Sequence, residues 1–365
     1  MGGSGWRTAA AQVPEGGLRG AAWEALVQAR VREQVPGSAA EKEQAAEMVL
    51  AGLKKNTRAE YARRYDTFAK WCAARGVSAF PAEAGALEGF LTSLQGTKQT
   101  LKNYVTAIST VHKLAQERTP FEGKGSWVSR MLDARGEEDL RKPSTGECRT
   151  AIPAEGVQQV LERALQDNID VAALRAAAVL GTGFLFYSRA GTSGATQKGD
   201  LNWDEDNLHY VVHEKHPTGS TRRQRQRSAP RRAPGVELVV RVLERWERLR
   251  PEGERSYFAL RGETKVTSTV ITACYRKALA EAGFTAVAPL WYGSHSVRSG
   301  GASACEAIGV LRPTIHTWGN WGQKSKDVEE CYIDYSIQPT QAAMDFFFWL
   351  TADGSRRAVG DLVMY

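Results

Sequence analysis

Two arginines, a histidine, a tryptophan and a tyrosine stand in the second half of the chain. His295 and Arg298 occur in SHSVRSGG, three residues apart at the start of a predicted helix, so both side chains project from one helical face. Trp321 follows Arg298 by 23 residues, Tyr332 lies another 11 on, and Arg189 comes directly after an apolar helical segment. Arginine binds oxyanions and imidazole handles protons near neutral pH, so these residue types could act together on an anionic substrate.

The order and spacing of these residues resemble the catalytic domain of the tyrosine recombinase and integrase family. That family carries an arginine after a helix with a downstream aspartate (here Arg189 and Asp200), a hairpin lysine, a His-x-x-Arg pair, a His or Trp, and a late tyrosine. The match covers 154–351, and HSVRSGG and YID are similar to recombinases of eukaryotic DIRS and Crypton elements. The resemblance implies a strand transferase that cuts and rejoins DNA through a 3′-phosphotyrosine, with no metal or other cofactor.

The resemblance also assigns a role to each residue of the set. Arg189 and Arg298 would bind the two non-bridging oxygens of the scissile phosphate by fork-shaped hydrogen bonds. His295 would carry the proton of the attacking phenol. Trp321 stands where many relatives have histidine and would donate one indole hydrogen bond, and Tyr332 would be the nucleophile.

In the family a hairpin lysine protonates the leaving 5′-oxygen. Lys215 fits this role, because it lies after the strand-like LHYVV and before the turn HPTGS. Lys198 is too close behind Arg189, and Lys265 opens a helix. We therefore expect Lys215 to be the general acid.

Two departures from the family pattern concern the nucleophile and the first arginine. Tyr332 lies 11 residues after Trp321, two more than the commonest family spacing, and Tyr335 lies 14 after it. The context Cys-Tyr-Ile favours Tyr332 over Tyr335. Thr192 stands three residues after Arg189, where relatives usually carry an acid. A threonine does not buffer the paired arginines electrostatically, so an altered activity is expected, though not its loss.

Hydrophobic periodicity and Gly/Pro breaks predict the elements that position these residues. Before the linker we expect amphipathic helices over 17–34, 40–74 (one helix or a pair), 83–95, 97–117 and 126–135. After it we expect helices at 154–166, 171–183, 235–249 and from 266 on. Among them we expect a strand at 208–212 and a basic strand that returns antiparallel to it. The sequence thus predicts a mainly α, two-domain protein with a small antiparallel sheet. Its predicted parts are a disordered N-terminus (1–16), an all-helical SAM-like core-binding domain (17–140), a linker (141–153) and an α+β catalytic domain (154–365).

Positive charge is concentrated in two places. The chain has a net charge of +7, residues 51–149 carry 17 Lys and Arg against 11 Asp and Glu, and 215–236 hold seven basic residues and no acidic one. Such stretches suit double-stranded DNA, although solvated basic faces are common. The residues predicted to contact DNA are Lys54, Lys55, Arg58, Arg63, Arg64, Lys98, Lys102, Arg222, Arg223, Arg225 and Arg227.

Other classes of function find little support. The five scattered cysteines include no C-x-x-C pair, no apolar run is long enough for a membrane span, and no phosphate-binding G-x-x-x-x-G-K-[ST] loop occurs. His209, His213 and His216 do not share one strand face, so no metal site is expected. We expect an intracellular protein, nuclear in a eukaryote and otherwise cytoplasmic, without a nucleotide cofactor or membrane partner.

The apolar segment PTQAAMDFFFWL (339–350) follows the tyrosines. Family members use such a helix to join protomers in a tetramer on two DNA duplexes, which implies a homotetramer; alternatively the segment covers its own core. Two other functions stay open. One is a non-catalytic DNA-binding protein derived from a mobile-element recombinase, and the other is DNA relaxation of the type IB topoisomerase kind.

Overall fold

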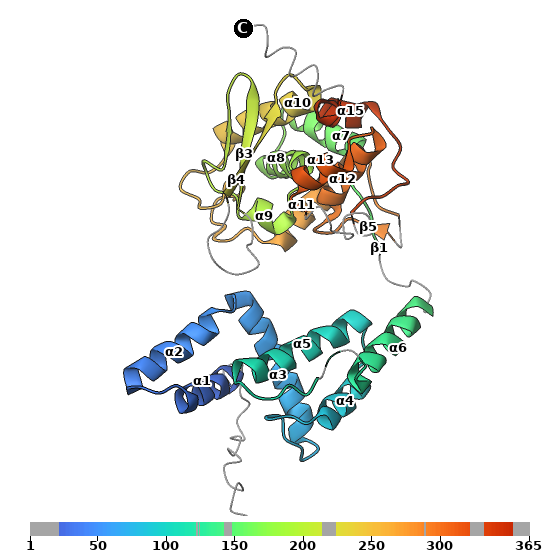
Figure 1. The fold of residues 1–365 in the computed structure, drawn as a ribbon. Helices are drawn as coiled ribbons and strands as arrows, with labels where there is room; N and C mark the ends of the chain where they lie inside the picture. Colours follow the sequence, from blue (N-terminus) through green and yellow to red (C-terminus); the bar gives the residue numbers. More distant parts are fainter. Residues whose placement is uncertain are drawn as a thin grey trace, which may run out of the picture. The chain divides into compact units, whose positions relative to one another are not determined.

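The structure is a computed structural model that describes residues 22–121, 123, 125–141, 148–213, 224–287, 290–321 and 332–352. The chain forms two compact units (Figure 1). The described residues through Arg141 form the first unit, and those from Cys148 on form the second. The predicted fold class, a helical domain followed by a mainly helical domain with a small antiparallel sheet, is confirmed.

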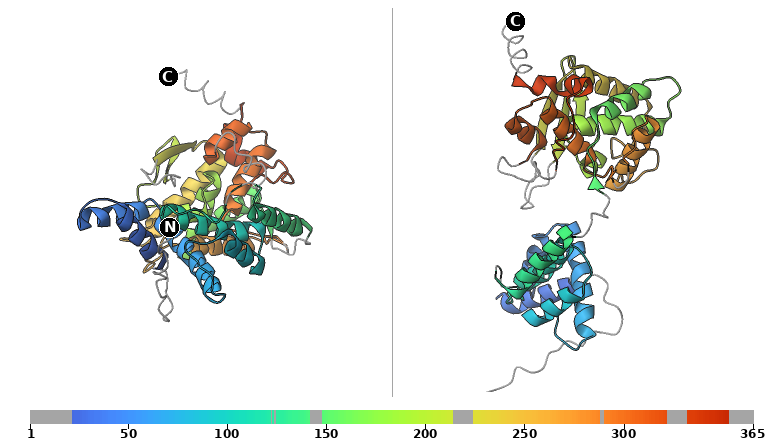
Figure 2. Two further views of the ribbon diagram at one scale, coloured as in Figure 1. Left: turned by 60° about the horizontal axis from the view of Figure 1, so that its bottom comes forward. Right: turned by 90° about the vertical axis from the view of Figure 1, so that its right-hand side faces the viewer.

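The first unit is entirely helical in its described residues. Helices α1 and α2 pair at one end, α3 and α5 pack together in the middle, and α4 and α6 lie at the other end (Figures 1 and 2). The helices are α1 (Ala22–Gln34), α2 (Ala39–Ala51), α3 (Lys55–Ala73), α4 (Ala84–Ser93), α5 (Lys98–Leu114) and α6 (Trp127–Arg141).

Aromatic residues at helical spacing form the core of this unit. Phe68 and Phe90 are buried and meet edge to face, with ring centroids 5.2 Å apart. Ser38 begins α2 with a capping box, and Thr97 caps α5 by accepting from the Thr100 amide. The segment predicted as one helix or a pair over 40–74 is therefore a pair, α2 and α3.

The second unit holds every described strand of the chain. Its elements are β1 (Cys148–Arg149), α7 (Ala154–Ala164), α8 (Val171–Leu185), α9 (Ala190–Gly194), β2 (Leu201–Trp203), β3 (Asn207–His213), β4 (Gln224–Pro230), α10 (Pro234–Leu249), α11 (Ser268–Glu281), β5 (Leu290–Trp291), α12 (Ser296–Ala307), α13 (Arg312–Gly319), α15 (Gln341–Phe347) and the short 3₁₀ helix η1 (Phe348–Leu350).

Helix α8 lies at the centre of the second unit (Figure 1). Every residue from Leu174 to Leu185 is buried, because α7, α9, α10, α11 and α12 all pack against this helix. Close approach needs a small residue at Gly181, where an added Cβ would lie 2.8 Å from Leu161. A mostly apolar helix that is buried on all sides is the expected centre of a helical domain.

The antiparallel sheet has the order β2-β3-β4. Leu208 and Tyr210 of β3 point into the core and pair with Ala229 and Arg227 of β4. Because side chains alternate along a strand, this register places Arg227 on the buried face. In a second sheet, β1 and β5 pair in parallel. Strand β1 lies within the segment that we expected to be a linker, and β5 lies far beyond it in the chain.

Candidate active site

The first part of the candidate site is the turn between α8 and α9. Tyr187 has a left-handed backbone (φ 50°), and the Ser188 amide closes the helix end by donating to the Gly183 carbonyl at 2.8 Å. Arg189 then caps α9, with its side chain exposed. The Ala190 amide donates to the Ser294 carbonyl at 3.3 Å, which brings the Arg189 segment next to the residue before His295.

Three side chains from distant segments donate to the carbonyl of the last residue of α8 and to those of the two residues that follow it. The Trp318 indole N–H donates to the Leu185 carbonyl at 2.8 Å. The Arg227 and Arg298 guanidinium groups donate to the carbonyls of Phe186 and Tyr187, each at 2.6 Å. Carbonyls at a helix C-terminus lack partners within the helix and attract cations, so both arginines are well placed there.

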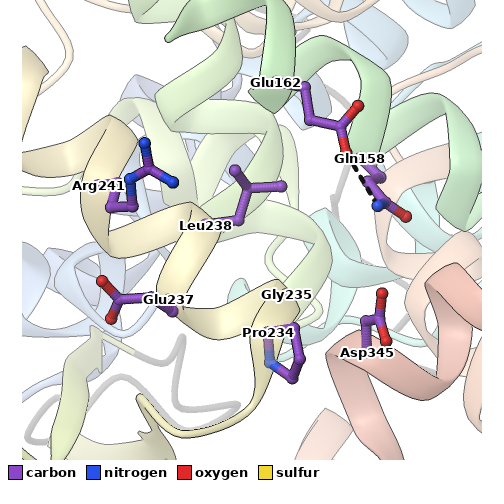
Figure 3. Close-up of a pocket in the computed structure, with 8 residues that line it drawn as sticks. All are labelled: Gln158, Glu162, Pro234, Gly235, Glu237, Leu238, Arg241 and Asp345. Carbon is purple, nitrogen blue, oxygen red and sulfur yellow. Dashed lines mark hydrogen bonds between the residues drawn. The ribbon is translucent and has the colours of Figure 1, made fainter.

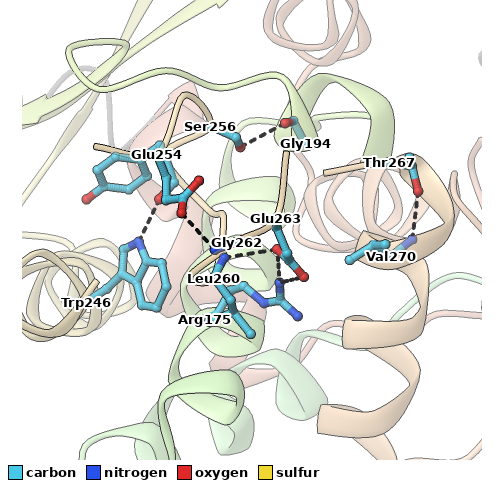
Figure 4. Close-up of polar contacts among 11 residues, drawn as sticks. Arg175, Gly194, Trp246, Glu254, Ser256, Leu260, Gly262, Glu263, Thr267 and Val270 are labelled. Carbon is cyan, nitrogen blue, oxygen red and sulfur yellow. Dashed lines mark hydrogen bonds and ion pairs between the residues drawn. The ribbon is translucent and has the colours of Figure 1, made fainter. Parts of the chain in front are cut away.

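The loop 250–267 packs against α9 (Figure 4). Buried Arg175 pairs with Glu263 at 2.8 Å, and Glu263 also accepts from the Leu260 amide at 3.0 Å. Ser256 donates its hydroxyl to the Gly194 carbonyl at 2.9 Å. Gly194 packs so closely that an added Cβ would lie 2.4 Å from the Val266 carbonyl oxygen. The loop 250–267 therefore fixes the short helix that Arg189 begins.

The histidine and the favoured tyrosine are in direct contact. The His295 Nδ1 and the Tyr332 Oη are 2.8 Å apart. The Tyr332 carbonyl accepts from the hydroxyl groups of Ser299 (2.9 Å) and Ser303 (3.3 Å), both on α12. The phenol is thus held against the helix that carries His295 and Arg298. Tyr335, by contrast, is 57% exposed.

Arg298 is the most enclosed charge of the site and is only 5% exposed. Its guanidinium carbon lies 4.0 Å from the Trp321 ring centroid and 5.4 Å from that of Tyr332. One of its nitrogens donates to the Gly319 carbonyl at 2.5 Å. The Nε of Arg298 and the indole Nε1 of Trp321 are buried and find no hydrogen-bond partner in the part of the chain that the structure describes.

The positive charges of the site act on each other. Burial, with the charges of Arg189 and Arg227, lowers the pKa of Arg298 to about 9, which leaves it charged at neutral pH. Burial lowers the pKa of His295 below 6.5, and the positive charges of Arg149, Arg189 and Arg298 lower it further. His295 is therefore mostly neutral at pH 7 and able to accept a proton.

The structure thus brings five of the six predicted catalytic residues into one region of the second unit. The side chains in direct contact are those of His295, Arg298, Trp321 and Tyr332. Arg189 is near enough for its charge to lower the pKa of Arg298. Lys215 lies outside the described residues. Sequence reasoning missed Arg149, which it placed in the linker, and Trp318.

The predicted DNA contacts fall in different surroundings. In the first unit Lys54, Lys55 and Lys102 are exposed. Ion pairs within the unit join Arg58 to Glu24, Arg63 and Arg64 to Glu60, and Lys98 to Asp133. Arg222, Arg223 and the Arg225 side chain lie outside the described residues.

Arg227 does not lie on the surface where a DNA contact was expected. Its side chain is 8% exposed and is directed to the end of α8, because the sheet register turns it inward. The DNA contact of Arg227 stays a prediction. Its charge acts on Arg298 instead.

The apolar C-terminal segment covers the core of its own unit. Phe346 and Phe347 are fully buried, and their rings lie 5.3 and 5.4 Å from that of Phe184. Of the two roles considered for this segment, the structure shows the packing on its own core.

A separate cavity of about 320 Å³ lies between α7, α10 and α15 (Figure 3). Three carboxylates line it against one arginine, Arg241: they belong to Glu162, Glu237 and Asp345. The excess of negative charge makes this cavity unsuitable for binding a phosphate. No cluster of metal-binding side chains occurs among the described residues, and none of the helices described could span a membrane.

The fold of this chain is shared by site-specific recombinases of known structure. Two solved structures of XerH site-specific recombinase bound to difH substrate share it. The post-cleavage complex matches with 12% identity and a TM-score of 0.54, covering 90% of this chain and 94% of that chain. The pre-cleavage complex matches with 13% identity and a TM-score of 0.52, covering 87% and 94%. No family model and no curated protein sequence matches the chain.

Proposed function

We propose that this chain is a site-specific DNA recombinase that cuts and rejoins strands through Tyr332. The observation that carries the proposal is the 2.8 Å contact between the Tyr332 phenol and His295, next to the buried Arg298. The fold supports it, because XerH, which shares this fold, is a site-specific recombinase that was solved with its difH substrate in pre-cleavage and post-cleavage complexes.

In the cleavage step the Tyr332 oxygen forms a bond to the scissile phosphorus, and the bond from phosphorus to the 5′-oxygen breaks. The phenol proton passes to the unprotonated Nδ1 of His295. The leaving oxygen takes a proton from Lys215. The products are a 3′-phosphotyrosine and a 5′-hydroxyl, and attack by a 5′-hydroxyl on that ester rejoins a strand. Since the ester bond energy is conserved, the reaction needs no nucleotide.

The charge that develops on the phosphate requires donors that are already in place. The Arg298 Nε and the Trp321 Nε1 are buried without a partner among the described residues, which is costly unless a ligand uses them. Arg189 extends its exposed guanidinium from the start of α9. These three residues would bind the non-bridging oxygens.

The partner would be double-stranded DNA, contacted by the basic side chains of the first unit and of the hairpin that includes β4. Lys55 and Lys102 are the simplest candidates there, since both residues are exposed. Strand exchange needs two cleaved duplexes, so we include assembly as a homotetramer on paired sites in the proposal.

The test is covalent capture on a nicked suicide duplex carrying a site selected from a random oligonucleotide pool. We expect a denaturant-resistant protein–DNA adduct with the wild-type protein and with Tyr335→Phe, and none with Tyr332→Phe. Filter or gel-shift binding of Tyr332→Phe to the same duplex should match the wild type, because only one hydroxyl is removed. An adduct that survives in Tyr332→Phe would refute the assignment.

Two further outcomes separate the other functions. DNA binding by the wild type without any adduct would indicate a non-catalytic DNA-binding protein. An adduct with relaxation of supercoiled plasmid, but without exchange between two marked duplexes, would indicate a type IB topoisomerase activity.

A further inference from the structure

Arg149 lies beside the candidate active site because of the short parallel sheet. In that sheet Arg149 pairs with Trp291, and the Thr150 amide donates to the Trp291 carbonyl at 3.1 Å. Gly293 leaves room for the arginine stem, since an added Cβ there would lie 3.2 Å from the Arg149 Cδ. The side chain thus crosses the segment that leads to His295.

Two exposed arginines share the Trp291 ring. The guanidinium carbon of Arg276 lies 4.5 Å from the ring centroid, and that of Arg149 lies 6.0 Å away. Arg276 is fixed by its Nε, which donates to the Tyr292 carbonyl at 2.6 Å. An aromatic face that holds guanidinium groups reduces their freedom while leaving the N–H edges available.

Arg149 differs from the paired arginines of the chain. No hydrogen bond or ion pair with another described residue engages its guanidinium, whereas Arg175 and Arg231, for example, pair with glutamates. Its positive charge nevertheless lowers the pKa of His295. Among the charges that lower the pKa of His295 it ranks ahead of Arg189.

We propose that Arg149, held by Trp291 and supported by Arg276, binds a backbone phosphate that neighbours the scissile phosphate. The inference rests on the proposed function and adds a phosphate-binding residue to it. The ligand class is a phosphodiester, because an exposed, immobilised guanidinium fork next to other positive charges matches a phosphate in shape and charge. A neighbouring phosphate fixes the register of the strand and so places the scissile one against Tyr332.

The first experiment does not depend on catalysis. Binding of a short fluorescent duplex is followed against KCl concentration for the wild type and for Arg149→Met, Arg149→Lys and Arg241→Met. Loss of one phosphate contact should make the log–log salt slope shallower by about 0.9 in Arg149→Met. Arg149→Lys should keep the slope, and so should Arg241→Met, which removes an exposed arginine beside the acidic cavity. An unchanged slope in Arg149→Met would overturn the proposal.

The second experiment locates the phosphate. Neutral methylphosphonates replace, one at a time, the phosphates that flank the scissile position in the suicide duplex. At one position the substitution should slow adduct formation by the wild type roughly tenfold, as expected for one lost charge-assisted bond, and have no further effect on Arg149→Met. The inference would be contradicted if, at every position, the methylphosphonate slowed adduct formation by Arg149→Met as much as by the wild type. If the wild type forms no adduct, the recombinase proposal fails, and the salt slope alone then decides the role of Arg149.

Discussion

At the residue scale the chemistry depends on groups whose properties are set by their neighbours. Burial and three arginines disfavour a proton on His295, and the Tyr332 hydroxyl lies within 2.8 Å of its Nδ1. Burial alone would tend to neutralise Arg298, yet its pKa of about 9 keeps it charged at neutral pH. In the proposed function these groups would supply a neutral proton acceptor and a charged phosphate ligand, which is the combination that phenol attack on a phosphodiester requires.

The lowered pKa of His295 predicts how cleavage depends on pH. As pH rises through that pKa, below 6.5, the imidazole loses its proton and becomes able to accept one, so single-turnover adduct formation should rise and then level off. Arg149→Met should move the midpoint upward, because removal of a positive neighbour stabilises the imidazolium. His295→Gln should lack this rise, and an NMR titration of the imidazole gives the pKa directly. A His295 pKa above 6.5 would be inconsistent with the site as described.

Trp321 should act through its indole N–H as well as through its ring. Trp321→Phe keeps an aromatic ring near Arg298 but removes the buried donor, and we expect adduct formation to slow by about 10- to 100-fold, equivalent to ~1.5–3 kcal/mol. Trp321→His retains a ring donor and should recover most of the rate. Equal rates for Trp321→Phe and the wild type would show that the N–H is not used.

At the element scale the end of α8 is the main positioning device. Trp318, Arg227 and Arg298 come from α13, β4 and α12, and each satisfies one successive carbonyl there. The turn that follows carries Arg189. A single helix end therefore links three separate parts of the unit to the segment of one candidate catalytic residue, Arg189.

Arg227 should be important for stability as well as for activity. Arg227→Met leaves the buried Phe186 carbonyl without its donor, which should lower the free energy of unfolding by ~1–3 kcal/mol. Arg227→Lys keeps a donor and a charge and should lose less. Urea unfolding followed by tryptophan fluorescence measures both, and Arg241→Met at an exposed position provides a basic control that is expected to change little. An Arg227→Met protein as stable as the wild type would mean that the guanidinium does not support the turn.

The packing of α9 gives a matched pair of substitutions. Gly194→Ala would place a Cβ 2.4 Å from the Val266 carbonyl and should cost ~1–3 kcal/mol of stability by displacing the loop 250–267. Gly191→Ala on the same helix meets nothing closer than 3.9 Å and should be neutral or slightly stabilising. Chemical denaturation of the two variants measures the difference, and similar stabilities would argue against the close contact.

At the scale of the whole molecule each unit has a hydrophobic core of its own. Phe68 and Phe90 belong to the first core, and Phe184, Phe346 and Trp246 belong to the second. A core of its own lets each unit unfold as a cooperative unit.

Calorimetry should therefore resolve two unfolding transitions. Phe68→Ala removes a fully buried ring of the first core and should lower one transition only, by ~3–5 kcal/mol of stability. Phe346→Ala should lower the other by a similar amount, since that ring packs on α8. A single transition shifted by both variants would show that the units unfold together.

The sequence by itself determined the candidate residues and the elements. Residue types and spacing named Arg189, His295, Arg298, Trp321 and Tyr332, and hydrophobic periodicity predicted the helices and the antiparallel hairpin, because these signals are local.

Only the tertiary structure decided which of these residues meet and which face each side chain takes. The sheet register turned Arg227 inward, and the parallel pairing of β1 with β5 brought Arg149 to His295. Both depend on contacts between residues far apart in the chain, and a strand of two residues, such as β1, is too short to give a periodic signal.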